Sequence, residues 1–315
     1  MKSIILIIVC SIAITNGYSI VYRHDVGEIP YRKLALESQF NCVGEVFNDY
    51  KPSGSCVLIG ERYVLTAAHL FIESDMFTDT SYMYHGKMIS MKEALKKSTS
   101  ERDSMKQVIL YHNRNNRVGK VENYQFRFQR RMYDAKRIVI FPGYLDSATK
   151  GSYDICLVEL EEPVTNVVPS IVNTRLDELG DTIVNVGFGA SGDASIPEDV
   201  GLYYQRLAGQ NMVDSIGGRL YKGQATQLVY DFDHPAMKEY NICGGNVPLP
   251  LEDIASGGDS GGGMFRKTKR GWELVGVCSG TNHDFNLLLK IGYYGQSGSY
   301  TRVSVFKDWL GEEMR

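Results

Sequence analysis

Short apolar runs separated by turns rich in glycine and polar residues make up most of the chain. The apolar runs include residues 56–59, 63–65, 138–141 and 182–188. The turn at 60–62 ends the first of these runs, and the turn at 142–143 ends the third. Short apolar runs bounded by turns are typical of strands in a sandwich or barrel. The pattern therefore predicts an all-β protein. Near the end, the helical spacing of Val305 and Trp309 predicts one terminal helix.

The first 19 residues differ from the rest. A positive start at Lys2 precedes an almost unbroken apolar run over residues 3–14, and small and polar residues follow up to Ser19. The run is shorter than the roughly 20 apolar residues that a membrane span needs. We interpret it as a cleaved export signal, which predicts a secreted or periplasmic protein with no membrane span after cleavage.

Composition places the chain among ordinary soluble proteins. The chain has a net charge of -3 and 43% apolar residues, and its length of 315 residues allows two domains. Five cysteines follow the signal, an odd number without CxxC or Cys/His spacing, so we expect no metal site and no cofactor. Two of them, Cys156 and Cys278, lie inside apolar runs, which predicts buried core positions.

One segment is strongly basic. Residues 86–137 hold 14 Lys and Arg against 5 Asp and Glu. We interpret residues 74–136 as a solvated insertion. The alternative is a surface for an acidic partner such as a polyanion; nucleic acid is not expected.

Three short motifs carry chemistry: Thr-Ala-Ala-His at 66–69, Tyr-Asp-Ile-Cys-Leu at 153–157 and Gly-Gly-Asp-Ser-Gly-Gly-Gly at 257–263. A serine hydroxyl needs a neighbouring base to act as a nucleophile. The carbonyl oxygen it attacks becomes negative and needs donors aimed at it. Glycines allow a sharp turn with bare N–H groups, so the N–H groups of Gly258 and Ser260 are candidates for an oxyanion hole.

Together these motifs resemble the chymotrypsin-like serine proteases, in which His, Asp and Ser occur in the same order. The resemblance covers about residues 20–72 and 137–315. It implies two antiparallel six-stranded β-barrels, over residues 20–165 and 166–315, followed by a C-terminal helix. It also implies His69 as general base, Asp154 as its orienting carboxylate and Ser260 as nucleophile, with Ser279 donating to Asp154.

The resemblance implies an activation pair as well. Ile20-Val21 is similar to the family's mature N-terminus, where a freed α-amine pairs with the aspartate before the nucleophile, here Asp259. Signal cleavage after Ser19 would free Ile20 directly, so export itself would activate the enzyme. The alternative is that Ile20-Val21 is simply a first strand.

Specificity rests on the residues that the resemblance assigns to the substrate pocket. Ile254 would form its floor, Thr281 would narrow the entrance and Gly298 would keep the far wall open. Ser279 would end the strand that lines the substrate. An isoleucine floor favours an apolar or small residue on the acyl side of the cleaved bond (P1). A shift of one or two residues would instead bring the Glu252 or Asp253 carboxylate inside and select a basic P1 residue.

The sequence therefore predicts a secreted serine endopeptidase that acts on proteins or peptides. Two other classes compete with it. The first is a non-catalytic binding protein on the same fold, since fold does not imply function. The second is an α/β-hydrolase esterase, whose Gly-x-Ser-x-Gly pattern is present at 258–262, but whose chain order of Ser, Asp, His is the reverse of the order here.

Overall fold

The computed structural model describes residues 20–85, 87–146, 148–149, 152–196, 205–245 and 247–315. The predicted export signal, residues 1–19, lies outside the described residues. The described chain forms two compact units, Phe71–Gly119 and the remainder.

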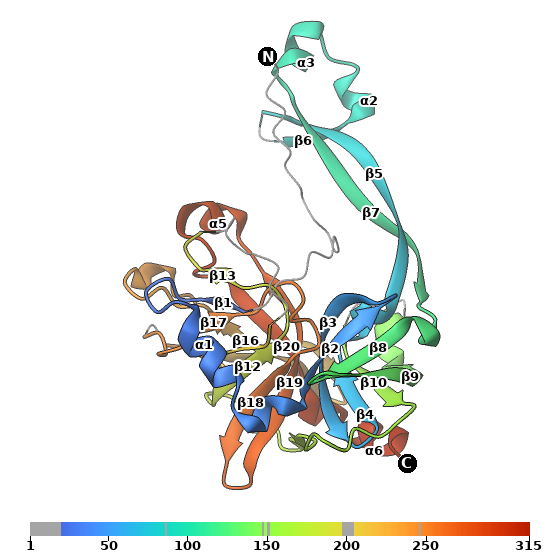
Figure 1. The fold of residues 1–315 in the computed structure, drawn as a ribbon. Coiled ribbons are helices and arrows are strands. Elements are labelled where there is room, and N and C mark those ends of the chain that lie inside the picture. Colours follow the sequence, from blue (N-terminus) through green and yellow to red (C-terminus); the bar gives the residue numbers. More distant parts are fainter. Residues whose placement is uncertain (1–19, 86, 147, 150–151, 197–204, 246) are drawn as a thin grey trace. The chain divides into compact units, whose positions relative to one another are not determined.

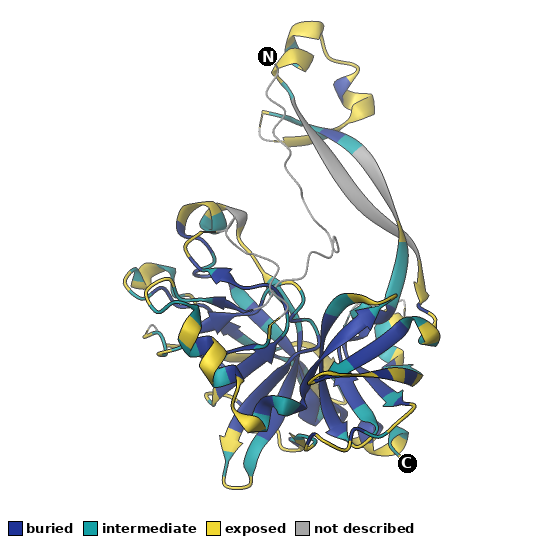
Figure 2. Ribbon diagram, in the orientation of Figure 1, coloured by how far each residue is buried: buried dark blue, intermediate teal, exposed yellow. Residues whose placement is uncertain are grey.

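The larger unit, which is the remainder of the described chain, contains the predicted first barrel. Six antiparallel strands close on one another in the order β10-β4-β3-β2-β8-β9 (Figure 1). Inward side chains such as Val57, Leu65, Phe126 and Leu157 are fully buried, which Figure 2 shows as dark ribbon. The strands are β2 (Val43–Asn48), β3 (Lys51–Gly60), β4 (Tyr63–Thr66), β8 (Tyr124–Phe128), β9 (Arg131–Ile140) and β10 (Cys156–Leu160).

Strands β8 and β9 correct the predicted insertion of 74–136, because both belong to this barrel. Their basic side chains pair with acidic neighbours: Arg127 Nε lies 2.6 Å from Glu45 Oε2, and Lys136 Nζ lies 2.5 Å from Glu159 Oε1. The separate unit is shorter, and residues 71–119 hold eight Lys and Arg against six Asp and Glu, a net of +2. Most of the positive charge that suggested an acidic partner is therefore absent from the separate unit.

The smaller unit is a long antiparallel hairpin with an elaborated tip. Strands β5 (Ile72–Tyr84) and β7 (Lys106–Val118) pair along their length, and β6 (Lys87–Ser90) pairs with β5. Two short helices lie between β6 and β7, α2 (Met91–Ala94) and α3 (Thr99–Ser104). Each opens with a capping box, Ser90 with Glu93 and Ser98 with Glu101, which satisfies the first N–H groups of the helix.

The second barrel-like sheet follows the path β14-β12-β18-β19-β20-β16-β15, with β11 paired to β19. It has eight strands where six were predicted. Asn211 donates its Nδ2 amide to the carbonyl oxygens of Asp231 at 2.8 Å and Asp253 at 2.9 Å, which links β14 to the end of β16. The strands are β11 (Ile171–Val172), β12 (Thr182–Gly187), β14 (Leu207–Met212), β15 (Ser215–Tyr221), β16 (Gln224–Asp231), β18 (Gly263–Thr268), β19 (Gly271–Asn282) and β20 (Ser297–Arg302).

The N-terminal segment lies against the C-terminal half, although its sequence position placed it in the predicted domain 20–165. Strand β1 (Val21–Tyr22) pairs with β13 (Gly192–Asp193) and with β17 (Asp253–Ile254). Helix α1 (Glu28–Ala35) packs on β14. Arg206 fixes the following 3₁₀ turn η1 (Ser38–Cys42), because its guanidinium donates to the Phe40 carbonyl at 2.9 Å.

The predicted terminal helix is confirmed as α6 (Lys307–Glu313), which buries Trp309 and Leu310. The other short helices are α4 (Pro142–Leu145), α5 (Phe285–Ile291), η2 (Ala68–Phe71), η3 (Val121–Asn123), η4 (Lys238–Tyr240) and η5 (Val303–Phe306). Cys156 and Cys278 are buried as predicted, and the five cysteines of the described chain are free thiols. Within the described ranges, a helix with the length and apolarity needed to cross a membrane does not occur.

Candidate active site

His69 lies in the 3₁₀ turn η2, which follows strand β4 of the first barrel. Its ring contacts two side chains that are distant in sequence. Nδ1 lies 2.7 Å from Asp154 Oδ2, and Nε2 lies 2.8 Å from Ser260 Oγ. The imidazole, the carboxylate and the hydroxyl therefore form one hydrogen-bonded row.

Asp154 is held by more than the imidazole. The backbone N–H of His69 donates to its Oδ1 at 2.9 Å, and the Ser279 hydroxyl donates to its Oδ2 at 2.8 Å. The Thr301 hydroxyl donates to its backbone carbonyl at 2.8 Å. Burial opposes the charged carboxylate, but the charge and hydrogen bonds of His69 and the hydroxyl of Ser279 outweigh that effect, so the pKa of Asp154 lies below its ordinary value.

The same pair raises the pKa of His69. Burial favours the neutral imidazole, whereas the charge and hydrogen bond of Asp154 favour the imidazolium, and the net direction is upward. A carboxylate facing Nδ1 places the ring proton there when the imidazole is neutral. Nε2 is then the atom free to accept the proton of Ser260.

The loop that carries Ser260 has a constrained backbone. Gly258 has φ +91° and Gly261 has φ +84°. Residues that carry a side chain rarely adopt these backbone conformations. A Cβ atom on Gly261 would also lie 2.1 Å from the carbonyl oxygen of Ser55 and 2.1 Å from Thr66 Oγ1. Glycine at 261 is therefore required both by φ and by the approach of the first barrel.

Ser55 on β3 holds this loop, and sequence reasoning did not single it out. Its hydroxyl donates to the Gly258 carbonyl at 2.9 Å and accepts from the Phe188 N–H at 2.9 Å, while its own N–H donates to the Ser260 carbonyl at 2.8 Å. The side chain is fully buried. The only sequence signal was a small polar residue at the start of an apolar run.

Asp259 is buried beneath the loop. Its carboxylate accepts from the N–H groups of Ser256 at 3.0 Å and Gly189 at 3.3 Å, and burial raises its pKa well above the ordinary value. Among the described residues no cationic side chain forms an ion pair with it. Ile20, the residue expected to supply its partner, is buried beside Tyr31 and Leu207.

The residues predicted to form the substrate pocket pack with Tyr230. Ile254, the predicted floor, is fully buried in a core cluster with it. The Tyr230 ring takes the space that Gly298 was expected to leave open, since a Cβ atom on Gly298 would lie 2.4 Å from the Tyr230 Cζ atom. The Tyr230 hydroxyl accepts from the Ala255 N–H at 3.0 Å, which fixes the ring there. Thr281, the predicted entrance residue, lies opposite Gly298 across β19 and β20 and contacts His283.

The two carboxylates that would have selected a basic residue are directed elsewhere. Asp253 is fully buried with its Oδ1 3.2 Å from Asn185 Nδ2. Glu252 accepts from the N–H groups of Asp233, at 2.9 Å, and Leu249. Both carboxylates that the alternative of a basic P1 residue invoked are therefore engaged within the described part of the chain.

In the part of the chain that the structure describes, no three His, Cys, Asp or Glu side chains are grouped so that they could hold a metal ion. What the arrangement provides is a base, an orienting carboxylate and a hydroxyl in hydrogen-bond contact. Such a row activates a hydroxyl for attack on a carbonyl carbon.

Two comparisons show which known proteins this chain is similar to. A family model described as trypsin matches residues 105–310, a range that includes Asp154 and Ser260 and starts after His69. A solved structure of neuropsin, a serine protease expressed in the limbic system of mouse brain, matches with a TM-score of 0.55 and 15% identity, covering 94% of this chain and 100% of that one. At that identity, the structural likeness concerns the fold alone.

Proposed function

The chain belongs to the trypsin family, and from this premise we propose that it is a secreted serine endopeptidase that uses Ser260, His69 and Asp154. The observation that carries the proposal is the hydrogen-bonded row, with 2.7 Å between His69 Nδ1 and Asp154 Oδ2 and 2.8 Å between His69 Nε2 and Ser260 Oγ. Its substrates are proteins or peptides.

In the proposed reaction, Ser260 Oγ attacks the carbonyl carbon of the scissile bond while its proton passes to His69 Nε2. The resulting imidazolium is stabilised by Asp154, which stays ionised because its pKa is lowered. His69 then donates that proton to the leaving amine, which departs and leaves an acyl ester on Ser260. A water molecule, deprotonated by His69, then attacks the ester carbonyl. His69 returns the proton to Ser260 Oγ as the acid product leaves, which restores the serine.

The oxyanion formed in both steps needs donors. We assign this role to the backbone N–H groups of Gly258 and Ser260. Ser55 supports the assignment, because its hydrogen bonds to the carbonyls of Gly258 and Ser260 fix the backbone on which both N–H groups lie. Donors fixed before the reaction need no reorganisation when charge develops.

Specificity follows from Tyr230. With its ring packed against Gly298 and its hydroxyl bonded to Ala255, a large P1 side chain has no space between β20 and the segment before Ser260. We therefore assign a preference for a small P1 residue. This narrows the sequence-based expectation of an apolar or small residue.

Export and activation are part of the same proposal. Removal of residues 1–19 frees the α-amine of Ile20, and that amine pairs with Asp259, whose buried carboxylate otherwise has only backbone donors among the described residues. A buried carboxylate without a counter-charge is strongly unfavourable. The pair orders the loop 256–261, so signal cleavage and activation are one event.

A fluorophosphonate probe tests the catalytic proposal. It should form one adduct, located by mass spectrometry on Ser260, in protein that starts at Ile20. The Ser260→Ala and His69→Ala variants should not react, whereas Ser256→Ala, a serine of the same loop, should react as the parent does. Folded parent protein that forms no adduct would identify the chain as a non-catalytic binding protein on this fold.

A further inference from the structure

The hairpin unit exposes apolar side chains at its tip, residues 87–105, which comprise β6, α2 and α3 at the end of the hairpin in Figure 1. Met88 is 47% exposed, Met91 45% and Leu95 62%. In the described parts of the two long strands, β5 and β7, only Val118 is exposed to a similar degree. Exposed apolar side chains that gather in one place are typical of an interaction site.

Helix α2 sets the direction of these side chains. Ala94 is its buried position, and the helix contacts β5 and β6. The Leu95 N–H donates to the Met91 carbonyl at 2.9 Å, so these two residues, the apolar pair, lie one helical turn apart on the same side. Lys92 and Lys96 each follow a member of the apolar pair by one residue, and both are exposed. This lysine pair therefore lies next to the apolar pair.

The tip also carries the net charge of the unit. Residues 87–105 hold five Lys and Arg against three Asp and Glu, so the net charge of +2 counted over residues 71–119 lies entirely there. Two of the three carboxylates are engaged with the tip's own backbone, because Glu93 and Glu101 are the capping-box residues of α2 and α3. Lys97 Nζ lies 4.0 Å from Glu101 Oε1, whereas among the described residues the lysine pair forms no ion pair.

Tyr84, at the end of β5, holds the tip in place. Its hydroxyl donates to Glu101 Oε1 at 2.7 Å, and its ring centre lies 5.2 Å from the Lys97 ammonium. Helix α3 is thereby joined to the strand, and the two capping boxes fix where both helices begin. The surface is therefore formed before any partner binds, which lowers the entropic cost of binding.

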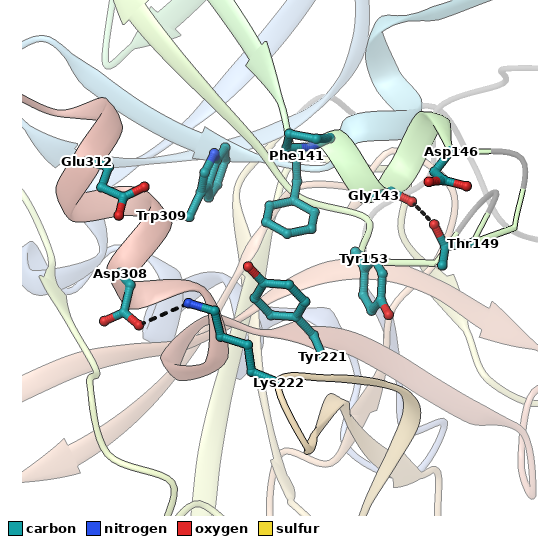
Figure 3. A pocket seen from close by; sticks show the side chains of 11 residues that line it. Phe141, Gly143, Asp146, Thr149, Tyr153, Tyr221, Lys222, Asp308, Trp309 and Glu312 are labelled. Carbon is teal, nitrogen blue, oxygen red and sulfur yellow. Dashed lines mark hydrogen bonds and ion pairs between the residues drawn. The ribbon is translucent and has the colours of Figure 1, made fainter.

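Apolar side chains around a cavity elsewhere in the protein are placed differently. In the cavity of about 370 Å³ that α6 borders, Phe141 lies between Trp309 and Tyr221, with ring centroids 5.3 Å and 5.1 Å away (Figure 3). These rings cover one another's apolar surface. The apolar pair is not covered in this way, since nearly half of Met91 and more than half of Leu95 are exposed. Its burial has to come from a partner.

The adjacency of the two pairs favours one kind of partner. A soluble polyanion would engage the lysine pair and leave the apolar pair in water. A bilayer with anionic headgroups accommodates both, because apolar side chains enter the boundary between headgroups and acyl chains while lysines reach the phosphates.

We infer that the tip docks on an anionic lipid bilayer, with the apolar pair inserted at the headgroup boundary and the lysine pair at the lipid phosphates. The inference does not depend on the proposed function, because no residue of the tip takes part in the row at Ser260. Its consequence is that the protein concentrates on anionic membrane surfaces.

Flotation with lipid vesicles tests the inference. The protein carries Ser260→Ala, which removes the proposed nucleophile, and the vesicles are phosphatidylcholine alone or equal parts of phosphatidylcholine and phosphatidylserine. The partition coefficient should be at least about tenfold higher for the mixed vesicles than for phosphatidylcholine alone. Added salt should lower it.

The apolar pair is tested by substitution with serine. Met91→Ser with Leu95→Ser should lower the partition coefficient for the mixed vesicles at least about tenfold. The control is Leu176→Ser with Leu179→Ser, whose side chains are 45% and 61% exposed and so match the apolar pair, and it should leave binding unaltered. Leu95→Trp should add fluorescence that brominated acyl chains quench, which reports insertion directly.

The lysine pair is tested in the same way. Lys92→Gln with Lys96→Gln should lower the partition coefficient at least about fivefold. Lys33→Gln with Lys269→Gln, the same chemical change at exposed positions outside the hairpin unit, should leave it unaltered.

Several results would overturn the inference. Equal binding to both kinds of vesicle would show that anionic headgroups are not recognised. Loss of binding with the lysine substitutions but not with the serine substitutions would assign the tip to a soluble polyanion. A dimer in size-exclusion chromatography that Met91→Ser with Leu95→Ser dissociates would assign it to a second copy of the chain. Equal effects of the control pairs, or no flotation of folded protein, would leave the tip without a membrane role.

Discussion

The hydroxyl of Ser55, on a strand of the first barrel, donates to the carbonyl oxygen of Gly258, on the nucleophile loop of the second, at 2.9 Å. The same hydroxyl accepts from the N–H of Phe188, so one buried side chain satisfies two backbone groups that are far apart in sequence. This contact makes the geometry at Ser260 depend on both halves of the fold. It also leads to the first prediction.

Ser55→Ala should lower kcat at least about tenfold with little change in KM, because the proposed donors would lose their fixed backbone. It should also cost roughly 1–3 kcal/mol of stability, since two buried backbone groups lose a partner. Rates per active site, from burst titration, together with urea unfolding of the Ser260→Ala forms, measure both effects. Ser53→Ala, on the same strand with one bond to the Val46 carbonyl, is the control and should change neither; an equal loss there would remove the special role of Ser55.

The second prediction concerns the effect of Tyr230 on the P1 preference. Tyr230→Ala should open the space beside Gly298 and raise kcat/KM for substrates with a large apolar P1 residue by at least about tenfold relative to those with P1 alanine. The cavity should cost about 3–5 kcal/mol of stability. A P1 peptide library measures the shift. Tyr230→Phe keeps the ring and should keep the parent profile, and Tyr230→Leu gives an intermediate opening if the alanine variant does not fold. An unchanged profile in a folded variant would place the P1 side chain elsewhere.

The triad could be predicted from sequence because each member lies in a short motif whose residue types the chemistry itself requires. A glycine-flanked serine and a histidine after small residues remain recognisable without knowing what they pack against. The structure adds the distances that join them. Ser279, assigned through the family resemblance, is also found in hydrogen-bond contact with Asp154.

Features that depend on pairing between distant segments could not be predicted in the same way. Strand β8 alternates Arg127 with inward aromatic residues, and its charge is understood only when Glu45 on β2 is known to face it. The packing of Tyr230 against Gly298 depends on the strand register that sets these two residues opposite each other. The docking of Val21 against Ile254 joins the start of the chain to its last third, and no local pattern reports it.

The raised pKa of His69 gives the third prediction. Only the neutral imidazole can accept the Ser260 proton, so kcat/KM should rise with pH as His69 deprotonates, with a midpoint above the ordinary value of about 6.5. Asp154→Asn should lower the rate by about 10⁴. The control is Ser279→Ala, which removes a single donor to Asp154 and should cost much less. A pH–rate profile whose midpoint is the same in parent and Asp154→Asn would contradict the assigned coupling.

Two buried acidic side chains, Asp233 and Glu252, give the fourth prediction. Burial raises the pKa of Asp233 to about 7 and that of Glu252 to about 8, with neighbouring carboxylates adding to the effect. Between pH 5 and 8 the folded protein therefore holds protons that the unfolded chain has released. The free energy of unfolding should fall as pH rises through this window, by at most about 1.4 kcal/mol per pH unit for each group.

Urea unfolding of the Ser260→Ala protein at several pH values measures that slope. Glu252→Gln cannot ionise and keeps a carbonyl oxygen for one of the two N–H groups, of Asp233 and Leu249, that donate to the carboxylate, so the slope should become shallower. Glu61→Gln, at an exposed turn, should leave it unchanged. A parent protein whose stability rises steadily from pH 5 to 8 would contradict the prediction.

The N-terminus gives the last prediction, which concerns activation. Protein starting at Ile20 should be active, and the same protein with one added glycine before Ile20 should lose at least about 100-fold in kcat/KM, because its amine could no longer reach Asp259. Asp259→Asn should make the two forms equally poor, since no buried charge is left to pair. The two N-termini and the two residues at 259 form a double-mutant cycle. A non-zero coupling of several kcal/mol is expected for a buried ion pair, whereas additive effects would mean that Ile20-Val21 serves only as the strand that pairs with Ile254.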